Sequence, residues 1–136
     1  MTIIVEKLPN EPIIVSTYSE PMKYDVEVPA MFARILALRD TITKSHKYYV
    51  VIDITQVKPG FNEVTAALGE VRKASMKRRE DMPISLHLAG TGDLFKFLAK
   101  SMSQMQYGSY IAPLHPSVDE ALSTIRAQIE SNSENT

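Results

Sequence analysis

The chain has 136 residues, of which 44% are hydrophobic and 23% are charged, and its formal net charge is −1. This length fits one domain with its own core, and the small net charge gives no bulk reason to expect nucleic-acid binding. The absence of cysteine excludes disulfides and thiolate metal ligands. No apolar run approaches the roughly 18 residues that a membrane span requires. The segment Met1–Lys7 lacks the basic start of a signal peptide, so we expect a soluble cytoplasmic protein.

The first elements in chain order are two β-branched runs, Ile3–Leu8 and Ile13–Thr17, separated by the turn-forming segment Pro9–Pro12. They predict an antiparallel strand pair near one edge of a sheet. The alternating segment Tyr24–Val28 leaves two interpretations open, an extension of the second strand or a connection. Pro29 suits the first turn of a helix. The apolar face of that helix comprises Met31, Phe32, Ile35, Leu38 and Ile42.

The segment Tyr48–Thr55 is the only unbroken apolar run of strand length. Such a run predicts a strand buried on both faces, at the centre of a sheet with helices above and below. A helix from about Phe61 to Arg79 follows it, and the alternating segment Ile84–Leu88 predicts the next strand. Gly90–Asp93 then predicts a tight turn into another helix.

That third helix is expected from about Asp93 to Gln106. A last short strand is predicted at Tyr110–Ala112, stopped by Pro113. Ser117–Glu120 has the form of a capping box that opens a final helix. Residues 1–130 are therefore expected to form a single domain, and residues 131–136 a polar C-terminal tail.

The predicted order is β-β-α-β-α-β-α-β-α. Strands that alternate with helices indicate parallel strands joined by right-handed crossovers. We therefore predict an α/β fold with a mixed, mostly parallel sheet of about five strands, an antiparallel N-terminal edge and about four helices.

This order resembles that of the STAS domains, the fold of anti-sigma-factor antagonists, and the related lipid-binding-like STAS set. The segment Tyr49–Val57 is similar to the third strand of that family with its terminal aspartate. Tyr110–Ala112 leading into Ser117–Leu122 is similar to the family's last strand and helix. The resemblance covers most of the chain, and its motifs are mainly apolar patterns.

One departure from the family concerns the loop after the central strand. Regulatory STAS proteins carry a phosphorylatable serine there, at the start of the next helix. In this chain the loop is Val57–Asn62, which contains no hydroxyl group, and Thr55 lies too early to replace the serine. The resemblance therefore implies a divergent member without the usual serine phosphoswitch.

Candidate ligand-binding residues lie where the predicted parallel strands end, because ligands bind outside the carboxyl ends of such sheets. These residues are Asp53, Thr55, Gly90, Thr91, Gly92 and His115. An anion site at a helix start stands against a plain tight turn, since G-T-G-D is neither a Walker loop nor the dinucleotide fingerprint. Asp53 is either a structural acceptor of N–H groups or a catalytic carboxylate, and no partner for catalysis is evident.

No other pattern indicates catalysis. The three histidines lack a metal-ligand spacing, and there is no nucleophile-elbow motif. We therefore predict no metal, no cofactor and no catalytic residue. The densest charged cluster is interpreted as a solvated helix face, with docking of an acidic partner, nucleic acid or lipid headgroups as the other interpretation; it comprises Arg72, Lys73, Lys77, Arg78 and Arg79.

The third helix carries apolar side chains over more than one stripe. The candidate interface residues on it are Leu94, Phe95, Phe97, Leu98, Met102 and Met105. A helix that covers one sheet face needs only about a third of its circumference buried. The excess indicates either a self-association surface or lipid-accommodating groove, or a helix wedged between the sheet and the last helix.

The leading hypothesis is a non-enzymatic STAS-like regulatory or protein–protein interaction domain, with a homodimer through the third helix as one form of it. The alternative is a small-ligand binding domain, for an anion, a nucleotide or an acyl chain, that uses the crevice at the strand ends. An enzyme that uses Asp53 and His115 is the third hypothesis. We expect neither nucleic-acid binding nor stable membrane insertion.

Overall fold

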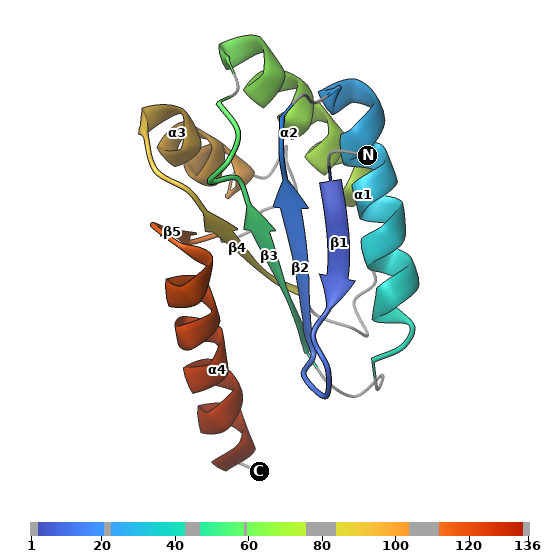
Figure 1. Ribbon diagram of the computed structural model, residues 1–136, viewed down its shortest axis with the longest axis vertical. Coiled ribbons are helices and arrows are strands. Elements are labelled where there is room, and N and C mark those ends of the chain that lie inside the picture. The colour runs from blue at the N-terminus through green and yellow to red at the C-terminus, as the bar shows by residue number, and fades with distance from the viewer. Residues whose placement is uncertain are drawn as a thin grey trace.

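The computed structural model describes residues 3–20, 23–42, 47–58, 60–75, 84–103 and 112–134. Within these ranges it contains five strands and four helices in the predicted order (Figure 1). The elements are β1 (Ile3–Lys7), β2 (Ile13–Tyr18), α1 (Tyr24–Arg39), β3 (Tyr48–Asp53), α2 (Phe61–Ser75), β4 (Ile84–Ala89), α3 (Asp93–Met102), β5 (Leu114–His115) and α4 (Val118–Glu134).

The strands lie in one sheet in the order in which they occur along the chain, β1-β2-β3-β4-β5. β1 is antiparallel to β2, and the pairs β2–β3, β3–β4 and β4–β5 are parallel. The predicted mixed sheet with an antiparallel N-terminal edge is confirmed. All six residues of β3 are buried, as expected for a central strand with helices on both sides.

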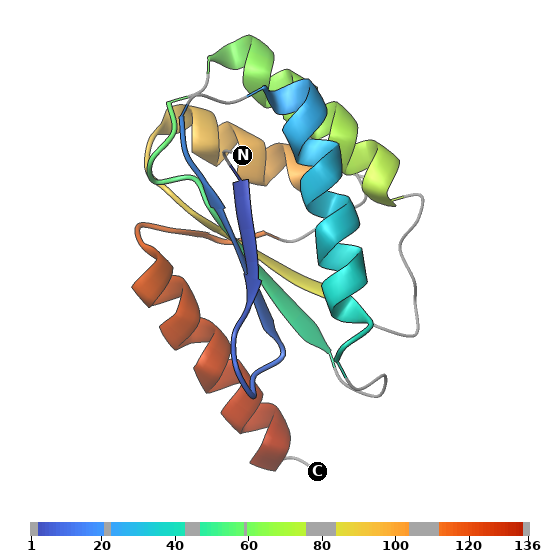
Figure 2. The same ribbon diagram turned by 45° about the vertical axis from the view of Figure 1, so that its right-hand side comes forward.

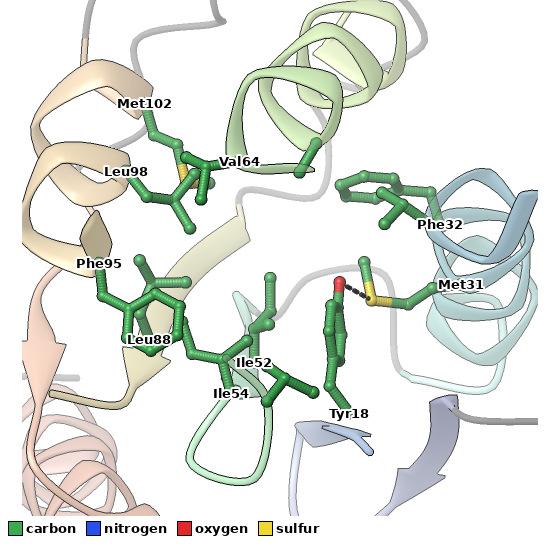
Figure 3. A pocket seen from close by; sticks show the side chains of 13 residues that line it. Tyr18, Met31, Phe32, Ile52, Ile54, Val64, Leu88, Phe95, Leu98 and Met102 are labelled. Atoms are coloured by element: carbon green, nitrogen blue, oxygen red, sulfur yellow. Dashed lines mark hydrogen bonds between the residues drawn. The ribbon is translucent and has the colours of Figure 1, made fainter. Parts of the chain in front are cut away.

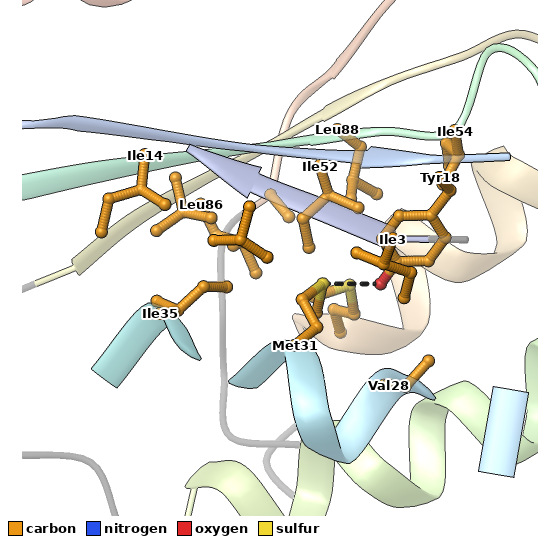
Figure 4. Packing of buried hydrophobic residues seen from close by; sticks show 14 of the residues in the cluster. Ile3, Ile14, Tyr18, Val28, Met31, Ile35, Ile52, Ile54, Leu86 and Leu88 are labelled. Carbon is orange, nitrogen blue, oxygen red and sulfur yellow. Dashed lines mark hydrogen bonds between the residues drawn. The ribbon is translucent and has the colours of Figure 1, made fainter. Parts of the chain in front are cut away.

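The helices form two unequal layers (Figure 2). Because each parallel strand is added on the same side of the previous one, right-handed crossovers bring α1, α2 and α3 to one face. Val50 and Ile52 point into the core beneath these three helices, where Ile35 of α1 packs toward Ile14 and Leu86 (Figure 4). The alternate residues Tyr49 and Val51 pack with Ala121 and Ile125 of α4, on the opposite face.

The first helix begins earlier than predicted. α1 starts at Tyr24, so Pro29 lies inside the helix rather than in its first turn. Residues 24–28 are helical, and neither interpretation of their alternating pattern was right. The backbone N–H of Lys23 donates to the Glu27 carboxylate at 2.7 Å, and the Glu27 N–H donates to the Lys23 carbonyl at 2.9 Å. This reciprocal contact closes the helix start, as the acidic side chain of a capping box does.

The last strand lies after Pro113, and the prediction that the proline stops it was wrong. β5 comprises Leu114 and His115, while Ala112 is outside the strand and Tyr110 and Ile111 fall outside the described residues. Although Pro113 has no N–H to donate, its carbonyl accepts a hydrogen bond from the Leu88 N–H at 2.9 Å. An edge strand tolerates a proline in this way.

The ends of the other helices differ from the predictions in detail. The Glu120 N–H donates to the Ser117 hydroxyl at 3.2 Å, which is the serine half of the predicted capping box. α4 continues to Glu134, so residues 131–134 of the predicted tail are helical. The predicted ends of α2 and α3, and with them Lys77, Arg78, Arg79 and Met105, lie outside the described residues, as do the side chains of Arg72 and Lys73.

Candidate functional site

Asp53 ends β3, and it is only 8% exposed. Its Oδ1 accepts hydrogen bonds from the Thr55 backbone N–H at 3.0 Å and from the Thr55 hydroxyl at 2.6 Å. Such contacts close an Asx turn. These two candidate residues therefore use their polar groups on each other, and the carboxylate shapes the turn that follows β3.

Two glycines shape the connection from β4 to α3. The Gly90 N–H donates to the His115 carbonyl at 2.8 Å, and a Cβ at Gly90 would lie 2.9 Å from Ile54 Cγ1 and 3.1 Å from the ring of Phe95. Gly92 has a φ of 115°, a conformation that favours glycine. The close approach of Ile54 and Phe95 accounts for Gly90, and the positive φ accounts for Gly92. Both glycines therefore support the tight-turn interpretation.

A histidine pair joins β4 to β5 on the sheet face that α4 covers. His87 is 1% exposed, and its Nδ1 lies 3.0 Å from Nε2 of His115, with the rings stacked at 5.2 Å between centroids. On its other side, Nε2 of His87 lies 3.1 Å from the Oγ of Ser85. With neutral imidazoles, the two hydrogen bonds run in the same direction, either from the Ser85 hydroxyl through His87 to His115 or from His115 Nε2–H through His87 to the Ser85 oxygen, and the tautomers set which. The three side chains form a continuous polar chain that fixes the two-residue β5.

The surroundings of His87 oppose a positive charge. Burial, together with the charges of His115 and Lys47, lowers the pKa of His87 to about 4. The Lys47 ammonium lies 5.7 Å from the centroid of the Tyr49 ring, on the strand next to His87. His87 is therefore a neutral, structural imidazole near neutral pH.

An apolar hollow lies on the other face of the sheet, between the sheet and helices α1, α2 and α3 (Figure 3). Its walls come from the carboxyl-terminal halves of β2, β3 and β4 and from all three helices. The Tyr18 hydroxyl is the one side-chain polar group among the lining residues that donates a hydrogen bond, to Sδ of Met31 at 2.9 Å. The lining residues are Tyr18, Val28, Met31, Phe32, Ile52, Ile54, Val57, Val64, Ala67, Leu88, Phe95, Leu98 and Met102.

The size of the apolar hollow limits what it can hold. Its volume is about 40 Å³, compared with about 150 Å³ for an engineered apolar cavity that binds benzene. In this conformation the hollow accepts only a few apolar atoms. A longer ligand would require α1, α2 and α3 to move apart.

Most of the apolar excess of α3 packs inward. Phe95 and Met102 are 8% and 1% exposed and belong to the core, and Leu94 and Leu98 pack against it while partly buried. Phe97 differs, because it is 42% exposed. Of the described residues in the predicted interface, only Phe97 therefore presents a large part of its side chain at the surface.

Phe97 has an aromatic neighbour that sequence analysis did not single out. Phe61, the first residue of α2, is 61% exposed, and its ring centroid lies 5.7 Å from that of Phe97 with a tilt of 37°. We call Phe61 and Phe97 the aromatic pair. Two exposed rings contributed by different helices form a continuous apolar surface, unlike single exposed apolar residues.

Comparisons of the chain with protein-family models, with curated proteins and with solved structures give no match. Within the described ranges, no helix is long and apolar enough to cross a membrane. The same part of the chain holds no group of three or more potential metal ligands.

The structure divides the six ligand-binding candidates between separate roles. Asp53 and Thr55 bind each other, the two glycines shape a turn, and Thr91 is exposed beside them. The His115 side chain turns toward His87, under α4. None of these six residues lines the apolar hollow, which lies on the opposite sheet face from the histidine pair.

Sequence analysis missed both the histidine pair and the apolar hollow. The alternation in Ile84–Leu88 does place His87 on the face opposite to Leu86 and Leu88. Its contact with His115 depends on the pairing of β4 with β5, where Ala89 lies opposite His115. That register could not be predicted while the last strand was placed before Pro113.

Proposed function

We propose that the chain is a non-enzymatic, STAS-like regulatory or interaction domain that binds a protein through the aromatic pair. The observation that carries the proposal is the exposure of Phe61 and Phe97, at 61% and 42%, in mutual contact. Aromatic side chains are enriched at the centres of protein interfaces and among the residues that dominate binding energy. Full burial of one such side chain contributes about 1.5–3 kcal/mol to the free energy of association. A partner that covers both rings therefore gains binding free energy from each of them.

The local geometry supports the non-enzymatic part of the proposal. Oδ1 of Asp53 accepts hydrogen bonds from Thr55, and Nε2 of His115 contacts Nδ1 of His87, so each of these groups already has a structural contact. In the loop before Phe61, the Lys58 backbone N–H donates to the Glu20 carboxylate at 3.1 Å. This loop carries no hydroxyl group, so binding is proposed to proceed without a phosphoserine switch.

Site-specific photo-cross-linking in the host cell tests this proposal. A photo-reactive phenylalanine analogue is placed at Phe61 or Phe97, and the matched control places it at Val26, which is also 61% exposed but lies in α1. We expect discrete protein adducts from the aromatic pair and none from position 26. Adducts of equal yield from all three positions, or none from any, would contradict the proposal.

A second candidate function, binding of a slim acyl or alkyl chain, is supported by the apolar hollow. Its lining is almost wholly apolar, which suits an acyl chain and does not suit the anion or nucleotide considered from the sequence. Opening of the three helices would let the chain enter, and the Tyr18 hydroxyl could donate to an oxygen of the ligand.

A thermal-shift series with saturated fatty acids tests this candidate, because a ligand of the native state raises the melting temperature with concentration. Ala67→Phe fills the hollow, whereas Ala66→Phe adds the same ring to an exposed neighbour on α2. Wild type and Ala66→Phe are expected to respond to the fatty acid, and Ala67→Phe is not. A wild-type protein that shows no shift at any chain length would rule the candidate out.

A further inference from the structure

The outer face of α3 carries a stripe of mixed charge around Phe97. Asp93, Lys96, Phe97 and Lys100 are spaced at i, i+3, i+4 and i+7, so they lie on one side of the helix. The side chains of Asp93 and Lys96 are 104% and 72% exposed, Phe97 is 42% exposed, and Lys100 is exposed. We call these four residues the α3 stripe. The opposite side of α3 packs into the core through Phe95 and Met102.

The α3 stripe is complementary to itself when it is reversed. If a second copy of α3 lies antiparallel, with a two-fold axis between positions 96 and 97, Asp93 lies opposite Lys100 of the second copy. Lys96 then lies opposite Phe97 of the second copy, and the two-fold axis repeats both contacts. From this pattern we infer that the partner which the aromatic pair binds is a second copy of this chain, docked through the α3 stripe. The inference rests on the proposed function and names its partner.

Each contact in this arrangement has a physical basis. The Asp93–Lys100 contacts pair opposite charges, and Lys96 over the Phe97 ring is a cation–π contact. In the single chain, Asp93 and Lys96 form only a loose ion pair at 4.0 Å with both side chains in water. Breaking this pair to form the contacts with the second copy therefore costs little binding free energy. Phe61 lies beside Phe97 and extends the apolar centre of the contact.

The same charges disfavour the other orientation. In a parallel pairing, each residue of the stripe would lie opposite its own copy, so that Asp93 would meet Asp93 and Lys100 would meet Lys100. Like charges placed opposite each other weaken an interface, and a sequence that combines attraction in one register with repulsion in another specifies orientation. The sign pattern of the α3 stripe therefore selects the antiparallel dimer.

A charge-exchange experiment on the full chain tests the inference. Asp93→Lys and Lys100→Glu each place like charges opposite each other in the homodimer. When the two variants are mixed in equal amounts, position 93 of one protomer and position 100 of the other again carry opposite charges, and the second contact is intact. Sedimentation velocity at low ionic strength measures the dimer dissociation constant of wild type, of each variant and of the mixture.

We expect a wild-type dimer that weakens with added salt, a dissociation constant raised by about tenfold or more in each variant, and a mixture close to wild type. Glu130→Lys makes the same charge change on the exposed side of α4 and is expected to leave the dimer intact. Melting temperatures of all variants are recorded, because Asp93→Lys also removes a favourable charge from the start of α3.

A monomeric wild type, a dimer that neither variant weakens, or a mixture without recovery would each overturn the inference. The cross-linking experiment separates this failure from failure of the proposed function. If the wild type is monomeric but position 97 is cross-linked to a different protein, the proposed function stands with another partner. If position 97 gives no adduct, both fail.

Discussion

His87 keeps its neutral form in the folded protein down to about pH 4, because burial and the charges of His115 and Lys47 lower its pKa. In the unfolded chain, a histidine takes up its proton near pH 6.5. Between these values the unfolded state binds a proton that the native state does not, so the free energy of unfolding falls as the pH falls. Above about pH 6.5 neither state holds the proton, and below about pH 4 both do.

The magnitude follows from the two pKa values. One pKa unit corresponds to about 1.36 kcal/mol, so the shift from 6.5 to about 4 predicts a loss of at most about 3 kcal/mol on acidification. Roughly three-fifths of it should appear between about pH 6.5 and pH 4.5. The value is an upper limit, because the partly exposed His115 lets water approach one side of the pair.

Urea unfolding of a His87→Leu variant at a series of pH values measures this effect. At pH 7.5 the variant should be less stable than wild type, since the hydrogen bonds to Ser85 and His115 are lost, at about 1 kcal/mol each. The difference should shrink by about 2 kcal/mol at pH 4.5, because the variant has no buried imidazole at this position to keep neutral. Ser85→Ala keeps both histidines, and its pH dependence should parallel that of wild type. A His87→Leu curve parallel to wild type over the whole range would refute the reasoning.

Substitutions at three further positions test backbone and capping contacts by chemical denaturation. Gly90→Ala should destabilise the protein by about 1–3 kcal/mol, because the new Cβ would lie 2.9 Å from Ile54. An unchanged denaturant midpoint would show that Ile54 moves away from the new methyl group without cost. Gly69→Ala, whose Cβ would meet nothing within 4 Å in the middle of α2, should instead stabilise it by about 0.5–1 kcal/mol. Ser117→Ala should lower stability by about 1 kcal/mol through loss of the α4 cap. Ser117→Asp, whose carboxylate can replace the serine hydroxyl as the cap, should retain most of the wild-type stability.

The central strand and the alternation of strands and helices could be predicted from the sequence, because burial on both faces leaves a direct compositional signal. The run Tyr48–Asp53 is buried at every position. Its neighbours followed from turn residues and apolar periodicity. The fold class therefore depended on patterns that are local along the chain.

The wrong predictions concern residues whose role depends on contacts between segments. The start of α1 is closed by the Glu27 carboxylate on the Lys23 N–H, a contact that an alternating pattern conceals. The start of β5 directly after Pro113 depends on the Pro113 carbonyl, which accepts a hydrogen bond from the Leu88 N–H of β4. The residue types alone predict neither of these two hydrogen bonds.

The candidate site was harder to predict than the fold for the same reason. Sequence analysis collected polar residues from strand ends, but Asp53 binds Thr55 within its own turn, whereas the His115 side chain contacts His87 on the adjacent strand. The exposure of Phe97 among otherwise inward-facing apolar residues of α3 depends on where α2 lies, since Phe61 packs beside it. Such information exists only once the helices are placed relative to one another.

The strand order of the sheet has a consequence for the way the chain folds during synthesis. Each strand pairs with the strand that precedes it in the chain, so the sheet can grow from β1 onward as the polypeptide leaves the ribosome, and no strand has to wait for a later one before it finds its first partner. The face that contains Ile13 and Val51 nevertheless lacks its cover until α4 emerges. Arg126 of α4 then reaches Glu11 in the first hairpin at 2.9 Å. An incompletely synthesised chain thus presents a preformed sheet with one bare apolar side, the form of nascent chain that chaperones must shield from aggregation.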